Sequence, residues 1–193
     1  MAQAYSVYTP LIAAVGIALP EFIVWIYGAE TRIQHVIGWM GFTCCIAGII
    51  GCLAAGLYID RYAQHKLVAV VLNGGSVISW LLFSTVLTRI KNVYLLFIVI
   101  AVYGAMSIPY YASGLEQVAE MTFPVAANTS SSVILMLSNL YGFIFIYVFG
   151  ALIEHNYPWS TLHLILGLYV LLTALVGFAK MKLKRTKVET ESK

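Results

Sequence analysis

Apolar segments of about 20 residues recur along this chain, which is the length at which a helix crosses the hydrocarbon core of a bilayer. In lipid, the backbone polar groups of each segment must be satisfied within that segment, so helices are expected. Hydrophobic residues make up 61% of the chain and charged residues only 10%, a balance that excludes a water-soluble domain of this size. The sequence therefore predicts an all-α integral membrane protein that has the lipid bilayer as a partner.

The predicted spans divide the chain into a bundle and a tail. The spans cover residues 6–27, 36–58, 67–87, 93–120, 129–153 and 161–180. Because the connections are short, neighbouring helices are expected to be antiparallel and to form one bundle over residues 1–180. Residues 181–193 are predicted to form a basic and polar cytoplasmic tail. Gly16 and Pro20 are positions at which the first helix could break, and Pro109 is one at which the fourth could kink.

The distribution of positive charge predicts the orientation of the helices. Six of the eleven Lys and Arg residues lie between Lys180 and Lys193, and they account for the formal net charge of +3, which therefore gives no reason to expect a nucleic-acid partner. Six spans place the N-terminus on the side of this tail, together with the loop that carries Arg61 and Lys66. Since cytoplasmic loops carry the excess of positive charge, both termini are predicted to be cytoplasmic.

No constellation of residues in the sequence suggests catalysis, so we expect neither an enzyme nor a metal site. The histidines are scattered at predicted loops or helix ends: His35, His65, His155 and His163. The cysteines Cys44, Cys45 and Cys52 all lie within one apolar segment, where free thiols packed as small residues are the expected state.

The stretch that joins the fourth and fifth spans carries a distinctive set of polar residues. Glu116 and Glu120 are four apart, which puts both carboxylates on one face of a helix. The dipeptide Phe123-Pro124 ends that helix, because proline disfavours helical geometry in the residue before it. The polar run 128–132 then offers N-cap residues for the next helix. That helix carries an amide, Asn139, about ten residues into an apolar run and so near the middle of the bilayer.

The second span has two features that concern its packing and its end. Ala47, Gly51 and Ala55 place a small residue at every fourth position, which lets a neighbouring helix come close; the alternative is that these residues face lipid. The span ends in Asp60 and Arg61. An aspartate at a helix end can accept hydrogen bonds from N–H groups at the start of a neighbouring helix and so lock the two helices together.

These motifs resemble those of the feline leukaemia virus subgroup C receptor-related family (solute carrier family 49) of the major facilitator superfamily. The resemblance rests on Glu116-x-x-x-Glu120-x-x-Phe123-Pro124 and on Gly56-x-x-x-Asp60-Arg61 with the basic loop that follows. It covers residues 38–180 and implies six transmembrane helices forming one half of a major facilitator superfamily bundle, the C-terminal half. The family usually carries Glu-Gly where this chain has Ala127-Asn128, so the cytoplasmic corner is expected to be built differently.

The resemblance implies a secondary transporter that moves a small organic solute by alternating access, from the haem, choline, ethanolamine or B6-type vitamin class. It implies no cofactor, and a place in the plasma membrane or the lysosomal membrane. The partners are then a small-molecule substrate and either the missing N-terminal half or a dimer partner. The alternative is a non-transporting half-module, or a truncated chain, that pairs with a partner half.

Certain polar residues are candidates for a functional role, and each also has a plainer explanation. The resemblance places Asn139 at a substrate-facing amide position, whereas the alternative is a hydrogen bond that joins two helices. Glu21 is an ionisable residue within a span and so a candidate for binding a cation or a proton; the alternative is an ordinary interfacial carboxylate. The resemblance also implies a gating role at the cytoplasmic end for Asp60, Arg61, Glu116 and Glu120. The alternative is that these residues are solvated groups at helix ends.

Overall fold

The structure is a computed structural model, and it describes residues 2–28, 31–62, 64–122, 126–155 and 157–178. Over these ranges the chain forms helices and no strand. The elements are α1 (Ala2–Tyr27), α2 (Thr31–Tyr62), α3 (His65–Thr85), the π-helical turn η1 (Val86–Ile90), α4 (Val93–Thr122), α5 (Ala127–Glu154) and α6 (Pro158–Phe178). Each of the described α-helices is long and apolar enough to cross a membrane, which confirms the predicted fold class. The predicted tail over residues 181–193 and the dipeptide Phe123-Pro124 lie outside the described residues.

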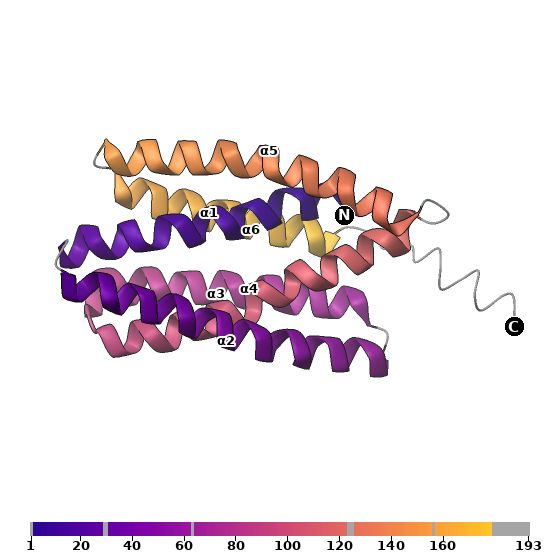
Figure 1. The fold of residues 1–193 in the computed structure, drawn as a ribbon, viewed down its shortest axis with the longest axis horizontal. Coiled ribbons are helices and arrows are strands. Elements are labelled where there is room, and N and C mark those ends of the chain that lie inside the picture. Colours follow the sequence, from indigo (N-terminus) through magenta and orange to yellow (C-terminus); the bar gives the residue numbers. More distant parts are fainter. Residues whose placement is uncertain (1, 29–30, 63, 123–125, 156, 179–193) are drawn as a thin grey trace, which may run out of the picture.

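The helices lie side by side in one bundle, and consecutive helices run in opposite directions (Figure 1). In that view α5, α6 and α1 lie on one side, α2 and α3 lie on the other, and α4 runs diagonally between the two sides. The most extensive packing joins α2 to α4, α1 to α5, and α3 to α4. Because consecutive helices are antiparallel, α1 and α5 form a parallel pair, and α2 and α4 form another.

The α2–α4 pair packs backbone against backbone. A Cβ atom at Gly51 would overlap the carbonyl oxygen of Ala105, and one at Gly104 would overlap the carbonyl oxygen of Cys44. Gly48 is buried and has no room for a side chain either, because Ile108 of α4 lies over it. The small residues of α2 therefore do admit a close neighbour, as the sequence predicts for Gly51, and a glycine of α4 meets them from the other side.

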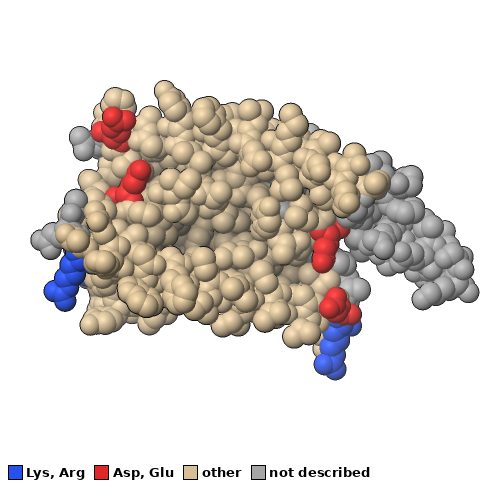
Figure 2. Space-filling model, in the orientation of Figure 1, with Lys and Arg blue, Asp and Glu red and all other residues tan. Residues whose placement is uncertain are grey.

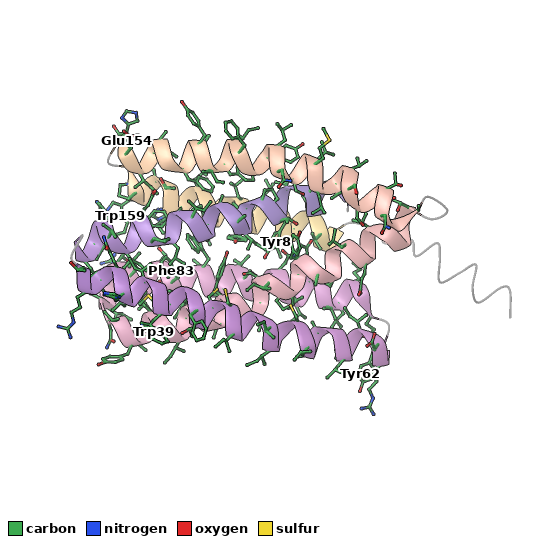
Figure 3. The ribbon with its side chains drawn as sticks, viewed as in Figure 1. Tyr8, Trp39, Tyr62, Phe83, Glu154 and Trp159 are labelled. Carbon is green, nitrogen blue, oxygen red and sulfur yellow. The ribbon has the colours of Figure 1, made fainter. Side chains whose placement is uncertain are left out.

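Hydroxyl-bearing aromatic rings fill the centre of the bundle, near the labelled Tyr8 in Figure 3. The hydroxyl groups of Tyr103 in α4 and Tyr169 in α6 are hydrogen-bonded at 2.6 Å. Tyr8 of α1 packs edge-on against Tyr110, with ring centroids 4.3 Å apart, and against Tyr169 at 5.5 Å. Trp80 of α3 donates its indole N–H to a carbonyl of α6 at 3.2 Å. These contacts tie four helices together at mid-depth, where aromatic packing is combined with hydrogen bonds between helices.

The start of α5 differs from the sequence-based prediction. The helix begins at Ala127 and its N-cap is Ala126, with no side-chain capping bond, so the prediction that the run 128–132 supplies the cap is wrong. These polar residues lie inside the first turns of the helix. The Ser132 hydroxyl donates to the carbonyl oxygen of Asn128 at 2.8 Å, a bond that satisfies a hydroxyl group without ending the helix.

Two prolines lie inside α1, and the helix continues through both of them. Pro10 and Pro20 interrupt neither the helix nor its run to Tyr27, so the predicted break near Gly16 and Pro20 does not occur. Proline is tolerated within membrane helices because neighbouring helices help to satisfy the carbonyl that it leaves without a donor. The helix ends instead at Tyr27 and is followed by Gly28, whose φ of 88° is left-handed and whose N–H donates to the carbonyl of Val24.

Candidate functional site

Charged side chains lie at the two ends of the bundle, and the surface between them is uncharged on the face that Figure 2 shows. We call one end the Trp25 end; it carries the end of α1, the start of α2 and the end of α5. We call the other the Asp60 end; it carries the end of α2, the start of α3 and the end of α4. Figure 3 labels Glu154 and Trp159 at the first of these ends and Tyr62 at the second.

A pocket of about 580 Å³ lies between α1 and α5 at the Trp25 end. Glu21 and Trp25 line it from α1, and Gly150 and Glu154 line it from α5. The two residues of each pair are four positions apart, so both pairs present one face of a helix to the same space. The space beside Gly150 is open, since a Cβ atom there would meet no atom within 4 Å.

The lining of this pocket combines negative charge with an aromatic wall. Glu21 and Glu154 are both exposed, and neither carboxylate forms an ion pair with another of the residues that the structure describes. The rings of Trp25 and of Trp159 in α6 form a T-shaped contact, with centroids 5.7 Å apart, which holds the Trp25 ring in place beside the pocket. Two carboxylates and an indole face attract a cation, and an indole face suits an ammonium group that has no N–H to donate.

Asn139 lies on the same side of α5 as this pocket but at a different depth. It is exposed, and it precedes Gly150 by eleven residues, which places the two within about 20° of each other around the helix and about 16 Å apart along it. Asn139 lies about 18 Å from the start of α5, close to its middle. The structure therefore does not bring Asn139 and Glu21 together, but it sets both along one face of the α1–α5 pair.

The interhelical bond considered as the alternative for Asn139 does not form within the described helices. No hydrogen bond of its side chain to another of these helices is present, and its neighbour Ser138 is the residue that points into the bundle. The amide of Asn139 is thus available on the outer surface of this bundle, where a substrate or a helix of a second bundle could meet it.

The candidate gating residues lie at the Asp60 end, as their positions in the sequence indicate. Asp60 and Arg61 are exposed at the end of α2, and Glu116 is exposed in the last two turns of α4. The Arg61 guanidinium lies 5.7 Å from the centre of the Tyr62 ring. Glu120 belongs to α4, but its side chain is outside what the structure describes. No ion pair joins Asp60 or Glu116 to another described residue, so these carboxylates are open to a partner.

Sequence reasoning misses three residues of this region. It selects Glu21 as a candidate but not Trp25, Glu154 or Trp159. The available signal is the spacing of four between Glu21 and Trp25, which puts a carboxylate and an indole on one helix face. That α5 brings Glu154 to the same place follows only from the packing of α1 on α5.

Comparisons with known proteins agree on one family. The sequence model of the Major Facilitator Superfamily matches residues 4–193. The chain is 25% identical over 189 residues to the choline/ethanolamine transporter FLVCR2 of Homo sapiens, covering 97% of this chain and 35% of the relative. It is 25% identical over 187 residues to an uncharacterized MFS-type transporter of Caenorhabditis elegans (96% and 31%), and 27% identical over 158 residues to the choline/ethanolamine transporter flvcr2a of Danio rerio (80% and 33%). The chain thus spans about a third of the length of the curated relatives that it matches.

Proposed function

This chain belongs to the major facilitator superfamily, and from that premise we propose that it is the C-terminal half of a secondary transporter for small organic ammonium compounds such as choline or ethanolamine. The relatives that carry those substrates in their names are similar to it over most of its length. Such transporters bind their substrate near the bilayer midplane, between two bundles that rock against each other. The second bundle is then supplied by a partner half, either upstream in a longer chain or on another molecule.

The pocket at the Trp25 end is the observation that carries this proposal. A quaternary ammonium group offers no strong hydrogen-bond donor, so a protein holds it with aromatic faces and with negative charge nearby. Trp25 supplies the aromatic face, and Glu21 and Glu154 supply the charge. The same carboxylates would repel the anionic propionate groups of haem, so the pocket favours the ammonium compounds over haem among the substrate classes that the sequence suggests.

Asn139 is the second proposed substrate contact, after the pocket at the Trp25 end. An ammonium compound that enters at the Trp25 end would meet the amide of Asn139 about 16 Å further along the same face of α5. Choline and ethanolamine each carry a hydroxyl group, which can both donate to and accept from an amide. We therefore propose that Glu21, Trp25 and Glu154 capture the cation and that Asn139 binds its hydroxyl group at mid-depth.

The proposed orientation places the Trp25 end outside the cytoplasm, with both termini inside. Trp25 and Trp159 then lie at the outer interface of the membrane, where tryptophan is enriched. Asp60, Arg61, Glu116 and Glu120 would close the cytoplasmic mouth by pairing with charges of the partner half. The proposal holds for the plasma membrane or a lysosomal membrane alike.

The test is equilibrium binding of choline to the purified chain in nanodiscs, measured by isothermal titration calorimetry. Each carboxylate about 4 Å from the cation contributes roughly 1 kcal/mol in water. We therefore expect the double variant Glu21→Gln, Glu154→Gln to bind choline roughly thirtyfold more weakly. Glu116→Gln, which removes an exposed carboxylate at the Asp60 end, is the matched control and should bind choline as the unmodified chain does. Equal loss in both variants would contradict the proposed capture site.

A further inference from the structure

We propose that the groove between α2, α3 and α4 binds one anionic phospholipid, with an acyl chain along the groove and the phosphate at the Asp60 end. The groove has a volume of about 430 Å³, and apolar side chains line it from all three helices. It is lined by other residues than the pocket between α1 and α5, and the proposed function gives its lining residues no role. The residues that define its course are Ile50, Gly51, Ala54, Tyr58, Leu67 and Ala105.

The shape of the groove follows from how the three helices pack. α4 packs extensively on both α2 and α3, whereas α2 and α3 hardly touch each other, so a V-shaped space opens above α4. Gly51 lets the backbone of α4 come close, and Ala105 of α4 forms part of the floor of this space. From Ile50 to Tyr58 the groove follows α2 for eight residues, or about 12 Å. It is therefore an apolar groove that can hold part of an acyl chain.

Arg61 places a positive charge at the end of this groove, on the face of α2 that lines the groove. Arg61 follows Tyr58, Ala54 and Ile50 by three, seven and eleven residues, so all of them share one face of the helix. Asp60 is turned about 100° away from that face. Arg61 is exposed, and its guanidinium lies over the ring of Tyr62. The carboxylate next in sequence therefore does not neutralise Arg61 on the groove side.

The start of α3 adds hydrogen-bond donors at the same end. The helix begins at His65, and its N-cap residue, Gln64, makes no side-chain capping bond. The Gln64 side chain instead accepts a hydrogen bond from the Tyr58 hydroxyl at 3.3 Å. The first backbone N–H groups of α3 are thus left without a side-chain cap, and such groups bind phosphate oxygens. Lys66, in the first turn of α3, is exposed at the same end but lies about 100° around the helix from Leu67, which lines the groove.

These features select an anionic headgroup over a zwitterionic one. An arginine fork and helix N–H groups bind the phosphate that all phospholipids share. Beyond the phosphate, Arg61 favours further negative charge and opposes the ammonium group of a choline headgroup. An apolar groove with a positive charge at its end matches an anionic phospholipid, which has an apolar chain and a charged headgroup. The proposal does not depend on which side of the membrane the Asp60 end faces.

Native mass spectrometry of the purified chain tests the proposal, with dioleoyl phosphatidylglycerol and dioleoyl phosphatidylcholine titrated in parallel. We expect one phosphatidylglycerol to bind per chain, at least tenfold more tightly than phosphatidylcholine. Arg61→Gln should lose this preference. Arg32→Gln, which removes an exposed arginine at the other end of α2, should keep it. Ala54→Phe should fill the groove and prevent binding, whereas Leu53→Phe, beside it but outside the groove, should not.

Certain results would overturn the proposal. These are equal binding of the two lipids by the unmodified chain, unchanged preference in Arg61→Gln, or unchanged binding in Ala54→Phe. Thermal melting followed by circular dichroism checks that each variant is folded. If Ala54→Phe is not folded, Arg61→Gln decides alone, because its side chain is exposed and its loss leaves the packing intact. Arg61→Lys keeps the charge and should retain most of the preference.

Discussion

The two parallel helix pairs of this bundle are built in opposite ways. In the α2–α4 pair, Gly51 and Gly104 bring two backbones into contact, and no side chain fits between them. In the α1–α5 pair, Gly142 packs against Pro10, where an added Cβ atom would lie 3.3 Å from the proline ring, but further along the helices separate around a pocket of about 580 Å³. In the α2–α4 pair glycine allows the helices to touch, and in the α1–α5 pair Gly150 lies beside open space.

The difference separates a structural pair from a pair that can hold a ligand. Contact along the backbone fixes α2 and α4 as one unit, because any shift would have to pull apart two closely fitted surfaces. The α1–α5 pair is fixed at Gly142 and open at the Trp25 end, where its charged and aromatic residues lie. The pocket that combines charged and aromatic residues thus lies where the two helices diverge.

The largest effect is expected where the contact is closest. Gly51→Leu forces side-chain atoms into the carbonyl of Ala105, and overpacking of this kind costs about 3 kcal/mol or more of stability. Thermal melting of the purified chain should show a large decrease in Tm. The control is Gly56→Leu on the same helix, where a Cβ atom meets nothing within 4 Å and the Tm should hardly change. Equal decreases in the two variants would show that α2 and α4 are not held by this contact.

The next effect concerns binding by the face of the α1–α5 pair. Asn139→Leu removes an amide donor and acceptor, so we expect choline to bind about 1–3 kcal/mol more weakly to the chain assembled with its partner half. Asn139→Gln keeps both groups and should lose less. The Tm of Asn139→Leu should stay unchanged, because the side chain is exposed and makes no hydrogen bond to another described helix. Unchanged affinity together with a lower Tm would show instead that Asn139 joins two helices.

A smaller loss is expected at the aromatic wall of the pocket. Trp25→Ala removes the indole face, which contributes about 1 kcal/mol to the binding of a cation at an exposed site. Choline titrated into the purified chain should therefore bind several-fold more weakly, and Trp25→Phe should restore part of the loss. Trp39→Ala is the control, since Trp39 is 64% exposed and lies on α2, outside this pocket. A loss of affinity in Trp39→Ala as large as in Trp25→Ala would show that the Trp25 indole does not bind the cation.

The smallest effect has the opposite sign. Gly150→Ala places a Cβ atom where nothing lies within 4 Å, and it lowers the conformational entropy of the unfolded chain. We expect the purified chain to gain about 0.5 kcal/mol of stability, seen as a small increase in Tm. Adding side-chain atoms would then raise the Tm at Gly150 and lower it at Gly51. A decrease in Tm for Gly150→Ala would mean that the α1–α5 pair is closed there.

The lengths of the apolar segments predict the number and positions of the described helices well. They predict the helix ends poorly where those ends lie outside the apolar core of the bilayer. The first predicted span, 6–27, ends where α1 ends, at Tyr27. The second, 36–58, is shorter than α2, which runs from Thr31 to Tyr62, because the helix continues through polar residues beyond the apolar core. The third is predicted to end at Leu87, but a π-helical turn continues to Ile90 and Lys91 then adopts a left-handed φ of 53°. Hydropathy contains no information on such a local change of winding.

The candidate site is predictable only in part, for a similar reason. Glu21 and Asn139 stand out in the sequence because a charge or an amide in an apolar span is costly. Glu154 does not stand out, since it ends its helix, and its meeting with Glu21 depends on α1 and α5, which are separated by three other helices in the chain. Gly104 has no signal of its own in the sequence, and its role follows from the carbonyl of Cys44 beside it. Contacts between distant helices are determined by packing, which periodicity within one span does not encode.

The bonds of the bundle interior have a consequence for how the protein is made. Tyr103 finds its hydroxyl partner in Tyr169, and the indole N–H of Trp80 finds its acceptor at Leu162, both on α6. As the chain leaves the ribosome, the third and fourth helices enter the membrane with these groups still lacking partners. Membrane insertion of α6 supplies both partners. Biogenesis of this half therefore ends with the helix that seals its interior, and a nascent chain halted before α6 would present two exposed polar groups to the quality-control machinery of the membrane.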